Sequence, residues 1–175
     1  MQNYIVLTAL GENHPHIIKK FTKAIKECDC NIIDSRVIVL GKELSLSMML
    51  NGSWNAVAKL EHMLPILQKE LKVEFQFRRT SPQDKSGRSM PYAIDIASMD
   101  RIGIVHDITD FLVSNQIDIQ ELNTNTYQAT HSGTPMFSLH VAINIPADIS
   151  ISAIRGDFID FCDRLNLDAI MEPIK

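Results

Sequence analysis

The sequence is poor in cysteine and has no long apolar run, and each shortage excludes a class of protein. Three cysteines in 175 residues are too few, and odd in number, for a disulfide framework. No segment approaches the ~18 consecutive apolar residues of a membrane-spanning helix. No basic stretch precedes the first apolar residues, as a signal peptide would require. The sequence therefore predicts a cytoplasmic protein with reduced, mostly structural thiols and no membrane contact.

Catalytic and metal-binding signatures are also scarce. His14 and His16 have the spacing of a metal-ligand pair, but no nearby cysteine or run of carboxylates completes a site. Asp95 and His140 share one face of their expected strands, without a serine or cysteine nucleophile beside them. That pair fits a polar contact at an interface between sheets better than catalysis. We expect no catalytic residue, no metal, no cofactor and hence no enzyme.

Charge is distributed unevenly along the chain. Residues 1–90 carry 13 Lys/Arg against 9 Asp/Glu, whereas residues 91–175 carry 4 against 12, which gives the halves charges of +4 and −8. Such asymmetry can steer association between repeats, subunits or partners. A lysine-rich helix face near residues 19–26 could contact phosphates, but a solvated face of an amphipathic helix explains it better. Without a DNA-binding motif, no direct sequence-specific DNA binding is expected.

The sequence does contain an internal repeat, in which both halves of the chain carry the same structural unit. Residues 4–80 and 92–174 show the same succession of apolar strands, amphipathic helices and turns. The first helix of each half carries matching residues, which are Ile17, Ile18, Phe21, Thr22 and Ile25 against Ile104, Val105, Ile108, Thr109 and Leu112. An internal repeat of this kind sets the fold before any single site is interpreted.

Within each half, the hydrophobic period alternates between strand and helix. In the first half, residues 14–28 read as a helix with Ile18 and Phe21 on its apolar face, and Ser53 reads as the N-cap of a second helix. Pro65 predicts a kink or a late start in that second helix. Residues 72–79 alternate strictly, which predicts a strand with Phe75 and Phe77 turned inward.

Each half therefore has the order βαββαβ, which predicts an α+β fold of two ferredoxin-like units in tandem. Each unit is expected to form an antiparallel sheet with both helices on one face. We assign residues 1–80 to the first unit, residues 81–91 to a linker rich in Ser, Pro and Gly, and residues 92–175 to the second unit. Because each unit is small, we expect the two to pack together as a pseudo-dimer.

The turn after the first strand of each unit carries a family resemblance. The second unit reads Asp100-Arg101-Ile102-Gly103-Ile104-Val105, which resembles the Asp-Arg-Pro-Gly-Ile-Val turn of ACT regulatory domains and departs from it only at Ile102. The first unit reads Asn13-His14-Pro15-His16-Ile17-Ile18, with a histidine where glycine is usual. The resemblance covers nearly the whole chain and implies an ACT-type unit in each half.

ACT units usually bind amino acids or other small effectors at this turn. A helix start leaves backbone N–H groups unpaired and favours an anion such as a carboxylate, while glycine permits close approach. The resemblance thus implies a ligand site at Asp100, Arg101, Ile102, Gly103 and Ile104. The matching positions Asn13, His14, His16 and Ile17 are expected to bind more weakly or not at all, because His16 fills the space that Gly103 leaves open.

A tandem pair of such units, without a catalytic or DNA-binding domain, resembles the glycine cleavage system transcriptional repressor family. That resemblance implies a regulator with an amino-acid effector, glycine, as its signal. It also implies a repressor that acts through a partner, the transcriptional activator protein of the glycine cleavage operon, rather than by reading DNA. The alternative is a regulatory subunit that controls an amino-acid metabolic enzyme. Self-association into a homo-oligomer is compatible with either.

Overall fold

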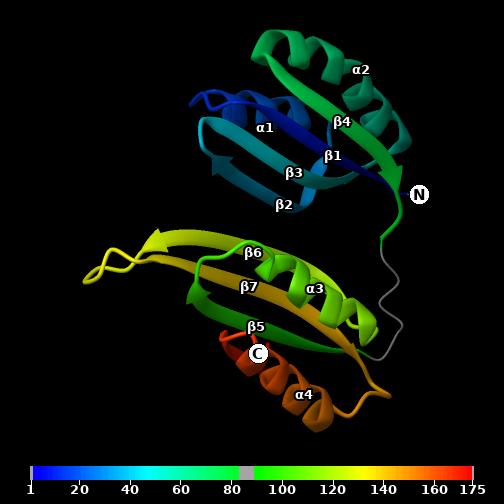
Figure 1. The fold of residues 1–175 in the computed structure, drawn as a ribbon. Helices are drawn as coiled ribbons and strands as arrows, with labels where there is room; N and C mark the ends of the chain where they lie inside the picture. The colour runs from blue at the N-terminus through cyan, green and yellow to red at the C-terminus, as the bar shows by residue number, and fades with distance from the viewer. Residues whose placement is uncertain (1, 83–88, 175) are drawn as a thin grey trace. The chain divides into compact units, whose positions relative to one another are not determined.

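The computed structural model describes residues 2–82 and 89–174. The chain divides into two compact units, Met1–Gln83 and Asp84–Lys175. Each unit is a four-stranded antiparallel sheet with two helices on one of its faces (Figure 1). The predicted fold class, two ferredoxin-like βαββαβ units in tandem, is confirmed. Across the described ranges, no helix is long and apolar enough to cross a membrane.

The first unit follows the predicted order of elements. Its elements are β1 (Asn3–Glu12), α1 (Ile17–Glu27), β2 (Asn31–Leu40), β3 (Glu43–Gly52), α2 (Trp54–Leu71) and β4 (Val73–Thr80). The strand order in the sheet is β2-β3-β1-β4, so the first and third strands are central, as expected. Helix α1 begins at Ile17 rather than at His14, because residues 13–16 form the turn that precedes it.

The second unit repeats this arrangement. Its elements are β5 (Ser89–Met99), α3 (Ile104–Ser114), β6 (Asp118–Gln128), β7 (Pro135–Pro146), α4 (Ile151–Arg164) and β8 (Asp168–Pro173), with the strand order β6-β7-β5-β8. Strand β5 begins at Ser89, so the last three residues of the expected linker belong to a strand. Residues 83–88 of that linker lie outside the described residues. The packing of the two units against each other stays a prediction.

Burial of one sheet face under two helices builds each core. Alternate residues of the central strands and one stripe of each helix are buried. The largest fully buried side chains are Ile5, Leu7, Phe21, Ile25, Leu46, Leu50, Leu60 and Leu64 in the first unit, and Ile94, Ile104, Ile108 and Phe158 in the second. In α1 the buried residue of the first turn is Ile17, 3% exposed, whereas Ile18 is 41% exposed. The expected stripe was therefore wrong at that position.

The backbone repeats in detail as well as in outline. The first helix of each unit is followed by a residue with a left-handed conformation, Asp29 (φ 57°) and Gln116 (φ 59°), neither of them glycine. The next strand carries an irregularity at the same place, between Ile32 and Asp34 in β2 and between Ile119 and Glu121 in β6. These shared features indicate that the two units follow one backbone plan.

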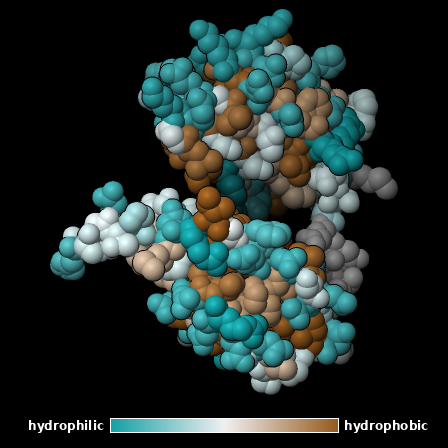
Figure 2. Space-filling view, in the orientation of Figure 1, coloured by the Kyte–Doolittle hydropathy of each residue, from teal (hydrophilic) through white to brown (hydrophobic). Residues whose placement is uncertain are grey.

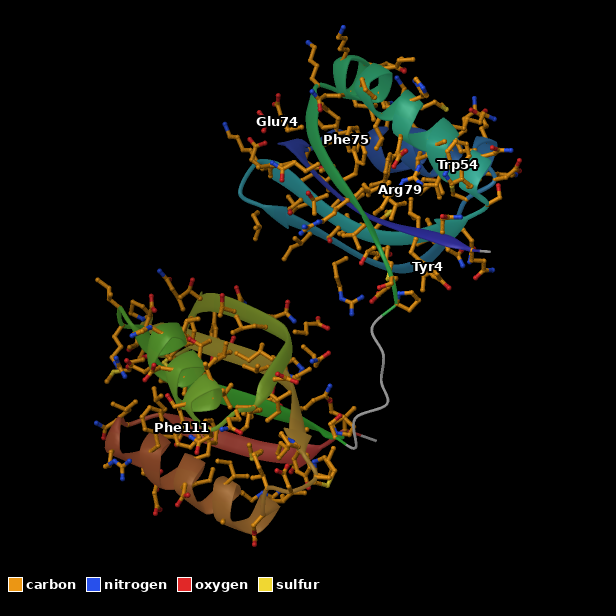
Figure 3. The ribbon with its side chains drawn as sticks, turned by 90° about the vertical axis from the view of Figure 1, so that its right-hand side faces the viewer. Tyr4, Trp54, Glu74, Phe75, Arg79 and Phe111 are labelled. Carbon is orange, nitrogen blue, oxygen red and sulfur yellow. The ribbon has the colours of Figure 1, made fainter. Side chains whose placement is uncertain are left out.

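Two expectations for the first unit need correction. Helix α2 begins at Trp54 and continues through Pro65, so the late start does not occur, and the kink, which was the alternative, stays a prediction. Phe77 lies on the helix-covered face, since it pairs with Leu7, yet it is 45% exposed because β4 is an edge strand that the helices cover only in part. Phe75, labelled in Figure 3, is the aromatic residue of β4 that reaches the core. Its ring stacks on that of Phe21, with 5.1 Å between the centroids.

The second core is closed by aromatic contacts between its helices. Phe111 of α3 is labelled in Figure 3. Its ring centroid lies 5.3 Å from that of Phe158 and 4.9 Å from that of Phe161, both in α4. Cys162 is buried in the same core, and burial raises the pKa of its thiol to about 12. The thiol therefore stays protonated at neutral pH and behaves as a small apolar group.

The uncovered edges of the two sheets differ in character. Strand β2 is exposed along its whole length and presents six large apolar side chains, which are Ile32, Ile33, Val37, Ile38, Val39 and Leu40. The equivalent strand β6 is mostly polar. Its one large apolar residue with an exposed fraction comparable to those of β2 is Tyr127, at 45%. Apolar patches accordingly interrupt the hydrophilic surface in the space-filling view (Figure 2). The repeat has kept its core and diverged at its surface.

A matched pair of serines tests the local stability of the helices. Ser53 caps α2, where its hydroxyl accepts a hydrogen bond from the Ala56 N–H at 3.1 Å, whereas Ser150 precedes α4 without a side-chain cap. Ser53→Ala should lower the free energy of unfolding by about 1 kcal/mol, measured by urea titration, because it orphans a helix N–H. Ser150→Ala should have a clearly smaller effect, and equal effects would contradict the capping role of Ser53.

Candidate functional site

The turn from β5 to α3 holds the residues expected to bind a ligand. Gly103 is the N-cap residue of α3 and has φ +99° and ψ −10°, a left-handed conformation that side chains disfavour. The nearest heavy atom to a side chain built at Gly103 is Nη1 of Arg101, at 3.9 Å. The backbone at the helix start is therefore open to a small molecule.

The start of α3 presents unpaired hydrogen-bond donors. The first intrahelical bond runs from the Asp107 N–H to the Gly103 carbonyl at 2.9 Å, and no side chain caps the helix. The N–H groups of residues 104–106 therefore precede the first helical hydrogen bond. Together with the helix dipole, these donors favour a negative group at this end of α3.

Arg101 lies beside the helix start, held by a partner that sequence reasoning missed. Both terminal nitrogens of its guanidinium lie 3.2 Å from Oδ2 of Asp107, and Nη1 lies 3.4 Å from the Ile102 carbonyl. The ion pair orients Arg101 and offsets part of its charge. An acidic residue in the first helical turn was the available signal, since such residues are common at helix starts. A guanidinium has five N–H donors, so it can still bind a carboxylate.

The other two residues of the turn have contrasting roles. The backbone N–H of Asp100 donates to the Pro135 carbonyl at 3.0 Å, which ties the turn to the first residue of β7. The Asp100 side chain does not cap α3, because Gly103 occupies the cap position and no side-chain hydrogen bond caps the helix. Ile102 is 100% exposed and contributes no packing. Asp100 therefore remains available to a cationic group.

The corresponding turn of the first unit has a different backbone. His16 is the N-cap residue of α1 in a right-handed conformation, with φ −91° and ψ −12°. The Ile17 N–H donates to the His14 carbonyl at 3.1 Å, and among described residues Ile104 forms no corresponding bond. The Asn13 N–H donates to the Lys42 carbonyl at 2.9 Å. The first turn therefore has one fewer free donor, in addition to a side chain at His16.

The other candidate groups from the sequence are the histidines of the first turn and the pair formed by Asp95 and His140. Nε2 of His14 lies 3.7 Å from Oε2 of Glu12, and His16 adds no third ligand. In the described part of the chain, no three His, Cys, Asp or Glu side chains gather closely enough to hold a metal ion. Asp95 and His140 do meet, as their strands predicted, with 2.7 Å between Oδ1 and Nδ1 on the helix-free face of the second sheet.

The lysine-rich face of α1 is partly neutralised. Nζ of Lys20 lies 2.7 Å from Oε1 of Glu70, and Nζ of Lys23 lies 3.5 Å from Oε1 of Glu27. Both ion pairs are exposed, so each contributes little to stability. These pairs support the interpretation of this face as a solvated surface rather than a phosphate-binding one.

Two glycines of the second unit test the conformation of the turn. Gly103→Ala should lower the free energy of unfolding by about 1–2 kcal/mol, because its left-handed φ is unfavourable for a residue with a Cβ atom. Gly156→Ala, inside α4 and with open space around it, should raise that free energy by about 0.5–1 kcal/mol. Urea titration measures both changes. Stabilisation by both substitutions would contradict the left-handed geometry of Gly103.

Comparison with known proteins places the chain in a family. The ACT domain model matches residues 3–78, which is the first unit. The chain is 31% identical over 167 residues to the glycine cleavage system transcriptional repressor of Escherichia coli (strain K12), covering 94% of this chain and 87% of that protein. The protein of that name from Shigella flexneri matches equally well.

Solved structures agree over the whole chain. The crystal structure of a protein provisionally named glycine cleavage system transcriptional repressor superposes with a TM-score of 0.74 and 26% identity, covering 100% of this chain and 99% of that one. An unknown protein from Galdieria sulphuraria has a TM-score of 0.80 at 20% identity with full coverage of both chains, which shows the shared fold alone. The chain belongs to the family of tandem ACT-domain proteins that includes the glycine cleavage system transcriptional repressor.

Proposed function

We propose that this protein is a non-enzymatic regulator that binds an amino acid, glycine, at the turn Asp100–Ile104 and controls transcription through a protein partner. The observation that carries the proposal is the start of α3, where a left-handed glycine precedes unpaired N–H groups. The name of the Escherichia coli relative supplies the expected signal and the expected output, which is repression.

The proposed binding mode uses both ends of a small amino acid. The carboxylate accepts hydrogen bonds from the first N–H groups of α3, where the helix dipole adds a favourable term. Arg101 supplies a further donor beside it, held in place by Asp107. The Asp100 carboxylate receives the ammonium group. A small ligand such as glycine suits this position, because Gly103 lets a carboxylate approach the backbone closely.

The proposed output is a contact with an activator protein rather than with DNA. The second half of the chain carries a charge of −8, which disfavours the phosphate backbone. The lysines of α1 that could contact phosphates are partly paired with glutamates. A protein partner agrees with both observations, because complementary charge steers protein association.

The binding mode predicts the effect of one charge substitution. Arg101→Gln should weaken glycine binding about tenfold in isothermal titration calorimetry, because it removes a charge-assisted hydrogen bond. His14→Gln, at the matching position of the first unit, should leave the affinity unchanged. Arg101→Gln is preferable to Gly103→His, which would combine a strained backbone with an obstructed site.

A ligand analogue provides the complementary test. Glycinamide lacks the carboxylate charge and should bind at least about tenfold more weakly than glycine. Circular dichroism of each variant should match that of the unaltered protein, since Arg101 is on the surface. If Arg101→Gln binds glycine normally and glycinamide binds as well as glycine, the effector site lies elsewhere and the turn is only a helix start.

The proposed output predicts a negative result with DNA alone. The purified protein should not retard DNA from the control region of glycine cleavage genes in a gel-shift assay, because its sequence carries no recognised DNA-binding motif. Adding the activator protein of those genes should produce a complex whose mobility changes with this protein. A specific shift by this protein alone, resistant to excess random DNA, would contradict the proposed mode of action.

A further inference from the structure

The helix-free face of the second sheet carries a cavity that the ligand-binding turn does not use. The cavity has a volume of about 680 Å³, and residues of β5, β6, β7 and β8 line it. Ala97 and Ser138, which pair across the two central strands, contribute small side chains to its lining. This volume falls in the range of small-molecule sites. All the lining residues belong to the second unit, so the cavity is a property of that unit alone.

Two carboxylates occupy diagonal positions in two neighbouring cross-strand pairs that line this cavity. Asp95 pairs with Ile170 and Asp168 pairs with Ala97, so Asp95 and Asp168 are diagonal neighbours on β5 and β8. Diagonal neighbours in an antiparallel pair lie roughly 7–8 Å apart. The other two residues of these pairs, Ala97 and Ile170, are apolar. The arrangement is a short apolar strip with one negative charge on each side.

No lysine or arginine contributes to the lining of the cavity. Its one basic group is His140, whose Nδ1 lies 2.7 Å from Oδ1 of Asp95 and orients that carboxylate. Two arginines of the second unit, Arg101 and Arg155, make their contacts elsewhere. Arg101 pairs with Asp107, and Arg155 donates to the Met171 carbonyl. The cavity therefore favours cations over anions, and the net charge of −8 in this half reinforces that preference.

We propose that this cavity binds a small aliphatic dication, a diamine or a guanidino-amine, whose two cationic groups contact Asp95 and Asp168. Its methylene chain lies over Ala97 and Ile170, where burial of apolar surface adds to the charge pairing. Asn123 of β6 and Ser138 of β7 also line the cavity, and their side-chain oxygens can accept further hydrogen bonds. This site is separate from the turn at α3 and does not depend on the effector proposed there.

The first unit offers an internal comparison. The register of its strands places Thr8 opposite Ser47 where the second unit has Asp95 opposite His140. It places Leu10 beside Glu74 where the second unit has Ala97 beside Asp168. In the first unit, Leu10 therefore stands where the second unit has the small residue Ala97, and Thr8 stands where it has the carboxylate Asp95. The same fold without the paired carboxylates and the open strip is not expected to bind a dication.

The test is calorimetric titration of the full chain with 1,4-diaminobutane and with agmatine, using 1-aminobutane as the single-charge control. Both dications should bind, and 1-aminobutane should bind at least about tenfold more weakly, because it contacts one carboxylate only. Asp168→Asn should weaken dication binding about tenfold. Ala97→Leu, which copies the first unit at a surface position, should abolish binding while circular dichroism and the melting temperature are retained.

A control variant separates a specific site from general attraction by an acidic protein. Glu74→Gln changes the carboxylate at the matching position of the first unit and should leave dication binding unchanged. Amide chemical shifts of Asp95, Ala97 and Asp168 should move on titration. The proposal is overturned if neither dication binds in the millimolar range, if 1-aminobutane binds as tightly, or if Ala97→Leu binds normally.

Discussion

Burial of one face of each sheet beneath two helices is the constraint on which the rest of this molecule depends. Side chains of a strand alternate between faces, so the demand for a buried apolar face fixes the register of every strand. Ile94 and Val141 are buried for this reason, and their neighbours Asp95 and His140 are turned to the opposite face. The polar face is thus a consequence of core packing, and a slip of one residue would exchange the two.

The repeat separates what the fold requires from what has diverged on it. Both units keep the left-handed residue after the first helix and the irregularity in the following strand, although the residues at those places differ. They differ at the turn before the first helix, where Gly103 of the second unit corresponds to His16 of the first, and on the open face, where Ala97 corresponds to Leu10. Both proposed ligand sites lie in the second unit, at positions where the repeat has become asymmetric.

The two proposed sites have opposite charge preferences within one small unit. At the start of α3, backbone N–H groups and Arg101 favour a carboxylate, while Asp107 holds the arginine in place. On the sheet face, carboxylates without a neighbouring lysine or arginine favour a cation. This separation is possible because a sheet with helices on one side presents its turns and its open face in different directions. Each site can therefore be altered by substitution without changing the residues of the other.

The sequence by itself determined the repeat, the order βαββαβ, the central strands, the Ser53 cap and the meeting of Asp95 with His140. The repeat, the order of elements and the cap follow from periodicity and signals along the chain. The meeting of Asp95 with His140 follows from side-chain alternation together with the adjacency of the first and third strands that the ferredoxin-like order implies. Only the tertiary structure decided that Phe77 is exposed, that Asp107 holds Arg101 and that a cavity lies between Asp95 and Asp168. Those features depend on how far a helix covers an edge strand and on distances across strands, and neither quantity is encoded in local periodicity.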